Sequence, residues 1–167
     1  MAQDDAGRHV GTGSDAASPS APRRVGRVLL LDESGRLLLL AGRNPSDPSA
    51  SRWWFTPGGG AEGDESAEQA ARRELEEETG LRLDALGPAV LERRAAFDFD
   101  GIHYDQEETY FLTRARHFVP ARSGHTELER RVLVGHRWWT LDELASLGET
   151  VYPPGLPELL RRIAPTR

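Results

Sequence analysis

The chain has 167 residues, of which 38% are hydrophobic, and its formal net charge at pH 7 is −6. This length suits a single domain with a hydrophobic core, while the acidic balance argues against binding to DNA or to a membrane surface, which depends on clustered Lys and Arg. The sequence contains no cysteine, which excludes disulfide bonds, thiol catalysis and cysteine-based zinc sites.

The first 23 residues are rich in Gly, Ser, Ala, Asp and Pro, with almost no large apolar side chain. Such a segment cannot bury enough surface to offset the entropy of ordering, so we predict a disordered tail at 1–23 and one folded domain at 24–167. The tail lacks the hydrophobic core of a signal peptide, and no apolar run reaches the length of a membrane span. We therefore expect a cytoplasmic protein without a membrane segment.

Two short apolar runs follow, "VGRVLLLD" and "RLLLLAGR", separated by "DESG". This pattern predicts two strands joined by a hairpin-type turn. The residues "NPSDPSAS" predict a loop, because Pro, Ser, Asp and Asn favour turns. The aromatic segment "RWWFT" predicts a short strand that ends at "PGGG".

A helix is predicted over 65–79, with Gly80 just past its last turn, where a left-handed backbone is common. The segments "AVLERRAAFDF" and "HYDQEETYFLTRA" predict two strands around a turn at Asp100 and Gly101. After the polar loop 119–131, "VGHRWWT" predicts a last strand. Thr140 and Glu143 form a capping box for a helix, and a further short helix is predicted at 157–163. The expected fold class is α/β, with a mixed sheet between helices in an α/β/α arrangement.

The predicted central helix carries an unusual stripe. At 100° per residue, one face contains Ala67, Ala70, Ala71, Glu74, Glu77 and Glu78. Two interpretations are open: an exposed acidic face paired locally with Arg72 and Arg73, or a site for a bound cation. Continuity of the glutamates with the alanines favours the second, because carboxylates crowded near a core are best explained by a hard cation such as Mg²⁺ or Mn²⁺.

The glycines of "TPGGGAEGD" precede this helix, and glycine lets a backbone approach a ligand closely. Loop and helix together resemble the Nudix box, which has fixed residues at defined spacings. Every specified position is filled, by Gly59, Glu65, Arg73, Glu74, Leu75, Glu77, Glu78, Gly80 and Leu81. The resemblance extends over the domain from about residue 24 to residue 163. It implies a Nudix-type α/β/α sandwich that hydrolyses a nucleoside diphosphate linked to another moiety, X.

The resemblance also implies roles for individual residues. Glu74, Glu77 and Glu78 would be ligands of Mg²⁺ or Mn²⁺, together with the backbone carbonyl of Gly58. Arg73 would orient these glutamates, while Gly59, Glu65 and Gly80 would have structural roles within the motif. The implied reaction is attack of a metal-bound water on a phosphorus of the pyrophosphate bridge.

A base must accept the proton of that water, and "YDQEETYF" offers Glu107 or Glu108 in addition to Glu77. Residues alternate along a strand, so Glu107 and Glu108 point to opposite faces. Glu108 shares its face with Gln106 and Tyr110, and we expect Glu108 to be the added ligand or base. A surface glutamate on an edge strand is the alternative.

Substrate contacts are expected from Arg43, Trp54, Arg94 and Tyr110. Each of the two tryptophan pairs, 53–54 and 138–139, lies on a predicted strand, so one ring of each pair should be in the core and the other could stack on a base or sugar. His103, His125 and His136 show no metal-ligand spacing.

The substrate class stays open between nucleotides, nucleotide sugars, capped RNA ends and ADP-ribose-type compounds. A different function on the same fold is a regulatory module that senses a nucleotide without hydrolysing it. Such modules usually lose glutamates of the box, whereas this chain has them all. The sequence allows either a monomer or a homodimer.

Overall fold

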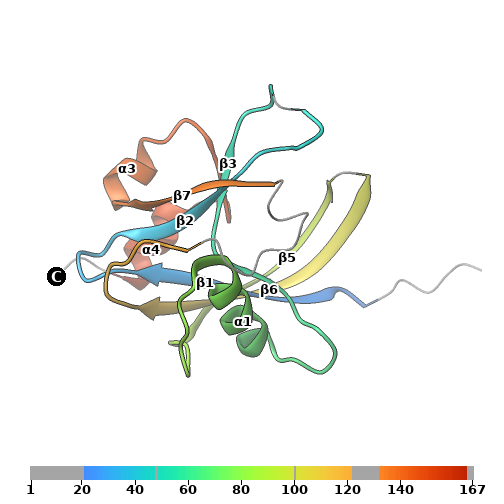
Figure 1. Ribbon diagram of the computed structural model, residues 1–167, viewed down its shortest axis with the longest axis horizontal. Coiled ribbons are helices and arrows are strands. Elements are labelled where there is room, and N and C mark those ends of the chain that lie inside the picture. The colour runs from blue at the N-terminus through green and yellow to red at the C-terminus, as the bar shows by residue number, and fades with distance from the viewer. Residues whose placement is uncertain (1–20, 48, 100, 122–131, 165–167) are drawn as a thin grey trace, which may run out of the picture.

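A computed structural model of the chain describes residues 21–47, 49–99, 101–121 and 132–164 (Figure 1). Most of the predicted tail therefore lies outside the described residues, as do Asp100, His125 and most of the predicted loop 119–131. The described chain forms one curled, eight-stranded mixed sheet with a helix on one face and two on the other.

The strands confirm the predicted α/β class. They are β1 (Arg23–Leu31), β2 (Leu37–Gly42), β3 (Trp53–Phe55), β4 (Gly58–Gly60), β5 (Ala89–Phe99), β6 (Ile102–Arg114), β7 (Leu133–Trp139) and β8 (Thr150–Tyr152). The strand order is β5-β6-β1-β2-β3-β8, with β4 paired to β1 and β7 paired to β2. Because β1 pairs with β6 and β3 with β8 in parallel, while the other pairs are antiparallel, the sheet is mixed. Two three-residue strands, β4 and β8, were not predicted.

The helices are α1 (Ala67–Thr79), α3 (Leu141–Ala145) and α4 (Leu156–Ile163). Helix α1 begins two residues later than predicted because Ser66 caps it and shares a capping box with Gln69. It ends, as predicted, at Gly80, whose φ of 80° is left-handed. No helix in the described part of the chain is long and apolar enough to cross a membrane.

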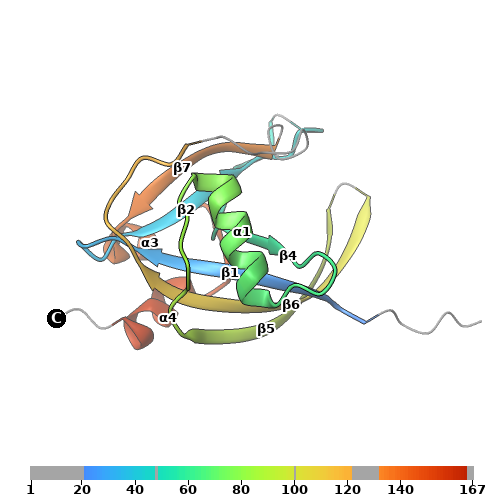
Figure 2. The same cartoon turned by 60° about the horizontal axis from the view of Figure 1, so that its bottom comes forward.

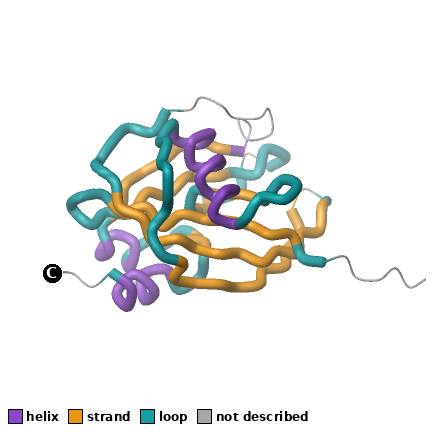
Figure 3. The backbone as a smooth tube through the Cα atoms, turned by 90° about the horizontal axis from the view of Figure 1, so that it is seen from below, coloured by secondary structure: helices purple, strands orange, loops and turns teal. Residues whose placement is uncertain are grey.

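Alternation along the strands gives the sheet two apolar faces. Figure 3 shows the strands of the sheet and the helices that pack on it. On the face we call the α1 face, Val28 and Phe111 pack with Leu75 of the helix. On the opposite face, which we call the α3–α4 face, Leu29 and Tyr110 belong to the same cluster as residues of α3 and α4. Neighbouring residues of β1 and β6 therefore point to different faces, and this assignment determines which side chains can meet.

Helix α1 lies directly on β1 (Figure 2). Ala70 and Ala71 are fully buried, as the small residues of the stripe predicted. A Cβ added at Gly26 would clash with the Ala67 carbonyl oxygen and lie 2.9 Å from the Cβ of Ala71. The absence of a side chain at Gly26 thus brings the helix into backbone contact with the strand.

Substitution of Gly26 by Ala should destabilise the fold. The added methyl group meets backbone rather than a movable side chain, and overpacking of this kind costs about 1–3 kcal/mol. Urea denaturation followed by circular dichroism measures the change in the free energy of unfolding. Gly148→Ala is the matched control, because its Cβ would meet nothing within 4 Å. Equal stabilities of the two variants would contradict the proposed contact.

Candidate active site

The candidate site is formed where β4 leads through a short loop into α1 (Figure 2). At one end, the backbone N–H of Gly58 donates a hydrogen bond to Oε2 of Glu78 at 3.0 Å. At Gly59, an added Cβ would lie 2.5 Å from Oε1 of Glu74. The glycines therefore let two carboxylates of the helix lie against the strand backbone.

The three glutamates differ in their surroundings. Glu78 is only 6% exposed, which is unusual for a charged residue and requires polar partners. The Glu74 side chain is also largely buried, at 12% exposed, whereas that of Glu77 is 36% exposed. The acidic stripe is thus neither wholly solvated nor wholly buried, and Glu77 has the most accessible carboxylate of the three.

Arg73 connects the helix to the loop. Its Nε and Nη2 atoms donate to the two oxygens of Glu65 at 2.9 and 3.0 Å, and Nη2 also donates to the Gly60 carbonyl at 3.0 Å. Its Nη1 atom lies 3.1 Å from Glu74 and 3.4 Å from Glu77. A planar guanidinium can make these bonds in several directions at once, which a lysine cannot.

These bonds shift the protonation equilibria of the pair. The hydrogen bond from Arg73 and the backbone N–H of Glu62 lower the pKa of Glu65 below its usual value. The same bond to Glu65, followed by the charge of Glu74, raises the pKa of Arg73. Both groups are therefore held in their charged forms at neutral pH.

The donor set fits a hard divalent cation, since it consists of carboxylate and carbonyl oxygens. The partly buried Glu74 and Glu78 carboxylates support this fit, because charges so placed gain from a cation. In the described residues, no group of three or more acidic or histidine side chains converges as a ready metal site. Arg73 pairs with Glu74 and Glu77 instead. A cation bound here would share these carboxylates with Arg73, since each carboxylate has two oxygens that can accept partners.

The prediction for β6 concerned whether Glu107 or Glu108 faces the site. The two side chains point to opposite faces, as alternation predicted, with Glu108 buried and Glu107 exposed. Glu108 accepts a hydrogen bond from the Tyr110 hydroxyl at 2.8 Å and forms ion pairs with Arg27 at 3.8 Å and Arg93 at 3.7 Å.

Arg27 was not predicted as a site residue. It lies on the α3–α4 face of β1, between the buried Val25 and Leu29. Its Nη1 atom donates to the carbonyl oxygens of Gly58 at 3.3 Å and Thr56 at 3.5 Å. The signal in the sequence was a single charged residue within an otherwise apolar alternating stripe.

Two expected substrate contacts are corrected by burial. Trp54 is 4% exposed and packs edge-to-face on Trp139 with ring centroids 4.9 Å apart, so its ring belongs to the core and cannot stack on a ligand. Its neighbour Trp53 is the more exposed of the pair. Tyr110 is 2% exposed, and its hydroxyl is occupied by Glu108, so it supports that carboxylate rather than contacting a substrate. Burial and the negative charge of Glu108 raise the pKa of Tyr110.

The expected arginine contacts also change. Arg94 lies on the α1 face, where its Nε and Nη2 atoms donate to the two oxygens of Asp105 at 2.9 and 2.6 Å. The neighbouring Arg93 is the one that reaches Glu108. Arg43 is exposed just after β2, and no recorded contact within the described residues joins it to the glutamates of α1.

A cavity of about 540 Å³ opens between the start of α1 and the β5–β6 hairpin. Its lining includes Ala67, both Arg93 and Arg94 of β5, and both Glu107 and Glu108 of β6. None of the three box glutamates lines it. The cavity is therefore separate from the contacts that join Glu78, Gly58 and Arg27.

A curled mixed sheet between helices, with a glycine-rich loop leading into a glutamate-bearing helix, defines a Nudix-type pyrophosphohydrolase. A model of the NUDIX domain matches residues 21–162. The chain belongs to the Nudix family.

Individual comparisons agree with this membership. An uncharacterized Nudix hydrolase of Listeria monocytogenes is 25% identical over 132 residues, which are 78% of this chain and 70% of the relative. The MutT protein from Methanosarcina mazei Go1 has the same fold, with a TM-score of 0.61 and 20% identity over 87% of this chain and 95% of that one. The NUDIX domain of Shewanella oneidensis NrtR, solved with ADP ribose, has a TM-score of 0.61 and 17% identity over 85% and 88% of the two chains.

Replacement of Glu65 by Gln should weaken the fold in a pH-dependent way. Because folding lowers the pKa of Glu65, its ionised form stabilises the protein above the ordinary value of 4.5. That stabilisation disappears as the pH falls through the lowered folded value. We expect a loss of about 1 kcal/mol at pH 7 that shrinks progressively as the pH falls below 4.5, measured by urea denaturation from pH 7 to pH 3.

Glu62→Gln is the control for this variant. Glu62 also lies near Arg73, but at 3.7 Å and with an exposed side chain, so its ion pair should contribute little. A Glu65→Gln deficit that is the same at pH 3 and pH 7 would count against the proposed ion pair.

Proposed function

We propose that the chain hydrolyses the pyrophosphate bond of a nucleoside diphosphate linked to X, with a divalent metal ion as cofactor. Membership of the Nudix family supports hydrolysis of nucleoside diphosphate derivatives in general. The observation that carries the proposal is the pairing of the glycine loop with the glutamate helix, in which Gly58 holds Glu78 and Arg73 holds Glu65. The ADP ribose bound to the NrtR domain supports a nucleotide-type substrate on this fold.

Glu74, Glu77, Glu78 and the Gly58 carbonyl would hold Mg²⁺ or Mn²⁺. When bound, the cations would activate the attacking water, grip phosphate oxygens and neutralise the leaving group. The Gly58 carbonyl already accepts a bond from Arg27, but that bond is long, at 3.3 Å, and a carbonyl oxygen has two lone pairs. The carbonyl therefore keeps capacity for a second partner.

The side chains of the site have separable roles in this proposal. The Gly58 amide fixes Glu78, and Arg73 fixes the loop to the helix through Glu65 and Gly60. The Glu77 carboxylate is the most exposed, which suits a group that accepts a proton from water. Glu108 is already bound by Tyr110 and two arginines, so we assign the base to Glu77 and not to Glu108.

A screen of nucleoside diphosphate derivatives with Mg²⁺ or Mn²⁺, with products separated by chromatography, tests the activity. Metal-dependent release of a nucleoside monophosphate or a phosphorylated X supports the proposal. Tight binding of a nucleotide without turnover across the panel would favour a sensing module instead.

Glu78→Gln should lower turnover by roughly 100-fold or more while the fold stays intact. The amide oxygen of Gln still accepts the Gly58 N–H, but the negative charge that attracts the cation is lost. Turnover and Mn²⁺ affinity, the latter by electron paramagnetic resonance, should fall together. Glu76→Gln is the control on the same helix, because Glu76 is exposed and lies off the acidic stripe. A fully active Glu78→Gln enzyme would refute the metal assignment.

A further inference from the structure

Two arginines meet one carboxylate on the α3–α4 face of the sheet. Arg93 of β5 is directly opposite Glu108 of β6, and Arg27 reaches the same carboxylate from β1 on the other side. Both ion pairs are long, at 3.7 and 3.8 Å, which leaves most guanidinium N–H donors unused by Glu108. The group carries two positive charges and one negative charge, so it retains a net positive charge.

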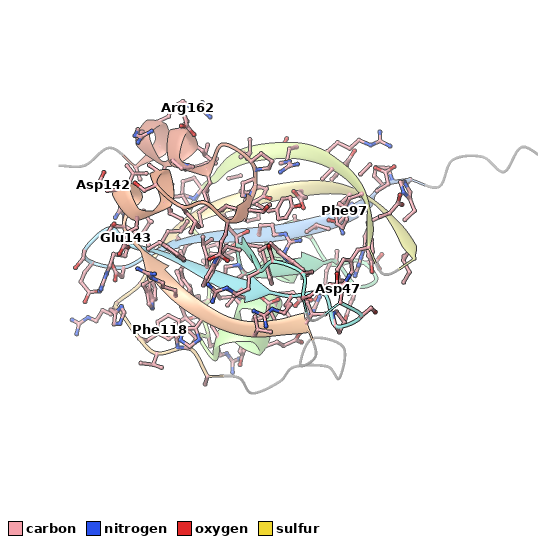
Figure 4. The ribbon with its side chains drawn as sticks, turned by 90° about the horizontal axis from the view of Figure 1, so that it is seen from above. Asp47, Phe97, Phe118, Asp142, Glu143 and Arg162 are labelled. Carbon is pink, nitrogen blue, oxygen red and sulfur yellow. The ribbon has the colours of Figure 1, made fainter. Side chains whose placement is uncertain are left out.

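The arginines are accessible to a ligand. The Arg93 side chain is 29% exposed and, within the described residues, makes this ion pair and no hydrogen bond. Figure 4 places Phe97 of β5 at the end of the molecule away from Asp142, Glu143 and Arg162 of α3 and α4. This end of the α3–α4 face is therefore not covered by those helices.

A buried polar atom without a hydrogen-bond partner among the described residues lies on the same face as Glu108. It belongs to Gln106, which precedes Glu108 by two residues toward the hairpin end of β6 and is only 5% exposed. Its Oε1 atom is buried and accepts no hydrogen bond from any described residue. An unpaired buried acceptor is costly, and a native structure that keeps one needs an explanation, such as a ligand that completes it.

The arginine pair is connected to the candidate active site through one residue, Gly58. Arg27 donates to the carbonyl of Gly58, and the N–H of Gly58 donates to Glu78. The Arg27 guanidinium therefore contacts the same loop residue that holds a box glutamate. Guanidinium groups bind phosphate oxygens through charge-assisted hydrogen bonds, so Arg27 is placed to contact a phosphate bound at this loop.

We propose that Arg27 and Arg93 bind the diphosphate of the substrate, and that Gln106 accepts a hydrogen bond from the group attached to it. Glu108 is then a positioning residue that holds the two arginines, and Tyr110 holds Glu108. The proposal rests on the proposed function, since the diphosphate is the one whose bond is hydrolysed. The competing location is the cavity between the start of α1 and the β5–β6 hairpin, which both Arg93 and Arg94 line, with the Arg94 side chain on the α1 face.

Arg93 and Arg94 are neighbours on one strand that point to opposite faces, so they make a matched pair. We would measure binding of methylenediphosphonate and of α,β-methylene-ADP by calorimetry in the presence of Mg²⁺. Neither probe has a cleavable P–O–P bridge, so binding is measured without turnover. Arg93→Gln should weaken both probes by roughly 10- to 100-fold, whereas Arg94→Gln should stay within about twofold of the wild type.

Two further variants sharpen the test. Arg93→Lys keeps the charge and should recover part of the lost affinity, which a purely structural role would not predict. Gln106→Leu should weaken α,β-methylene-ADP several-fold and leave methylenediphosphonate unchanged, because the diphosphate alone lacks the attached group. Circular dichroism verifies that each variant is folded.

Wild-type affinity in Arg93→Gln would overturn the proposal. A larger loss of affinity in Arg94→Gln would also overturn it and would indicate that the anion binds on the α1 face. Unchanged binding of α,β-methylene-ADP in Gln106→Leu would show that Gln106 does not contribute to the proposed binding site. The outcome is independent of the hydrolysis screen. Normal hydrolysis with unaltered binding in Arg93→Gln would reject the arginine site alone, whereas a selective loss in Arg93→Gln without any hydrolysis would reject the proposed activity alone.

Discussion

The buried carboxylate of Glu78 is the constraint on which the site depends. A charge with 6% exposure must be compensated, and the Gly58 amide supplies one hydrogen bond at 3.0 Å. That bond requires β4 to lie beside the last turns of α1, and β4 in turn pairs with β1. The short strand of glycines is therefore held by the same interaction that orients the helix, so the positions of the loop and the helix depend on each other.

Arg73 makes the crowding of the remaining charges tolerable. Glu65, Glu74 and Glu77 would repel one another on the loop and the helix, and a single guanidinium contacts all three. The arrangement has a functional side as well. Arg73 offsets part of this negative charge, and a divalent cation at the proposed site would share the carboxylates of Glu74 and Glu77 with it.

The sequence predicted much of the fold, and the reasons for its failures are specific. Apolar runs, turn residues and caps identified the long strands and the three helices of the described residues, since those signals are local. Strands β4 and β8 have three residues each and exist through pairing with β1 and β3, which no local pattern reveals. Alternation correctly placed Glu107 and Glu108 on opposite faces, yet it could not say which tryptophan of the 53–54 pair was buried or which carboxylate each of Arg93 and Arg94 meets. Those answers depend on the partner strand.

The direct packing of α1 against Gly26 has a consequence for how the substrate specificity could change. Gly26 and Arg27 are consecutive residues of β1. The residue that contacts α1 and the residue that carries the guanidinium on the other face are therefore one peptide unit apart, about 3.8 Å between their Cα atoms. Loop motion cannot lengthen that separation. The backbone spacing between the α1 contact and Arg27 is thus fixed. The surrounding loops can therefore diversify over evolution to accept a different X without changing that spacing.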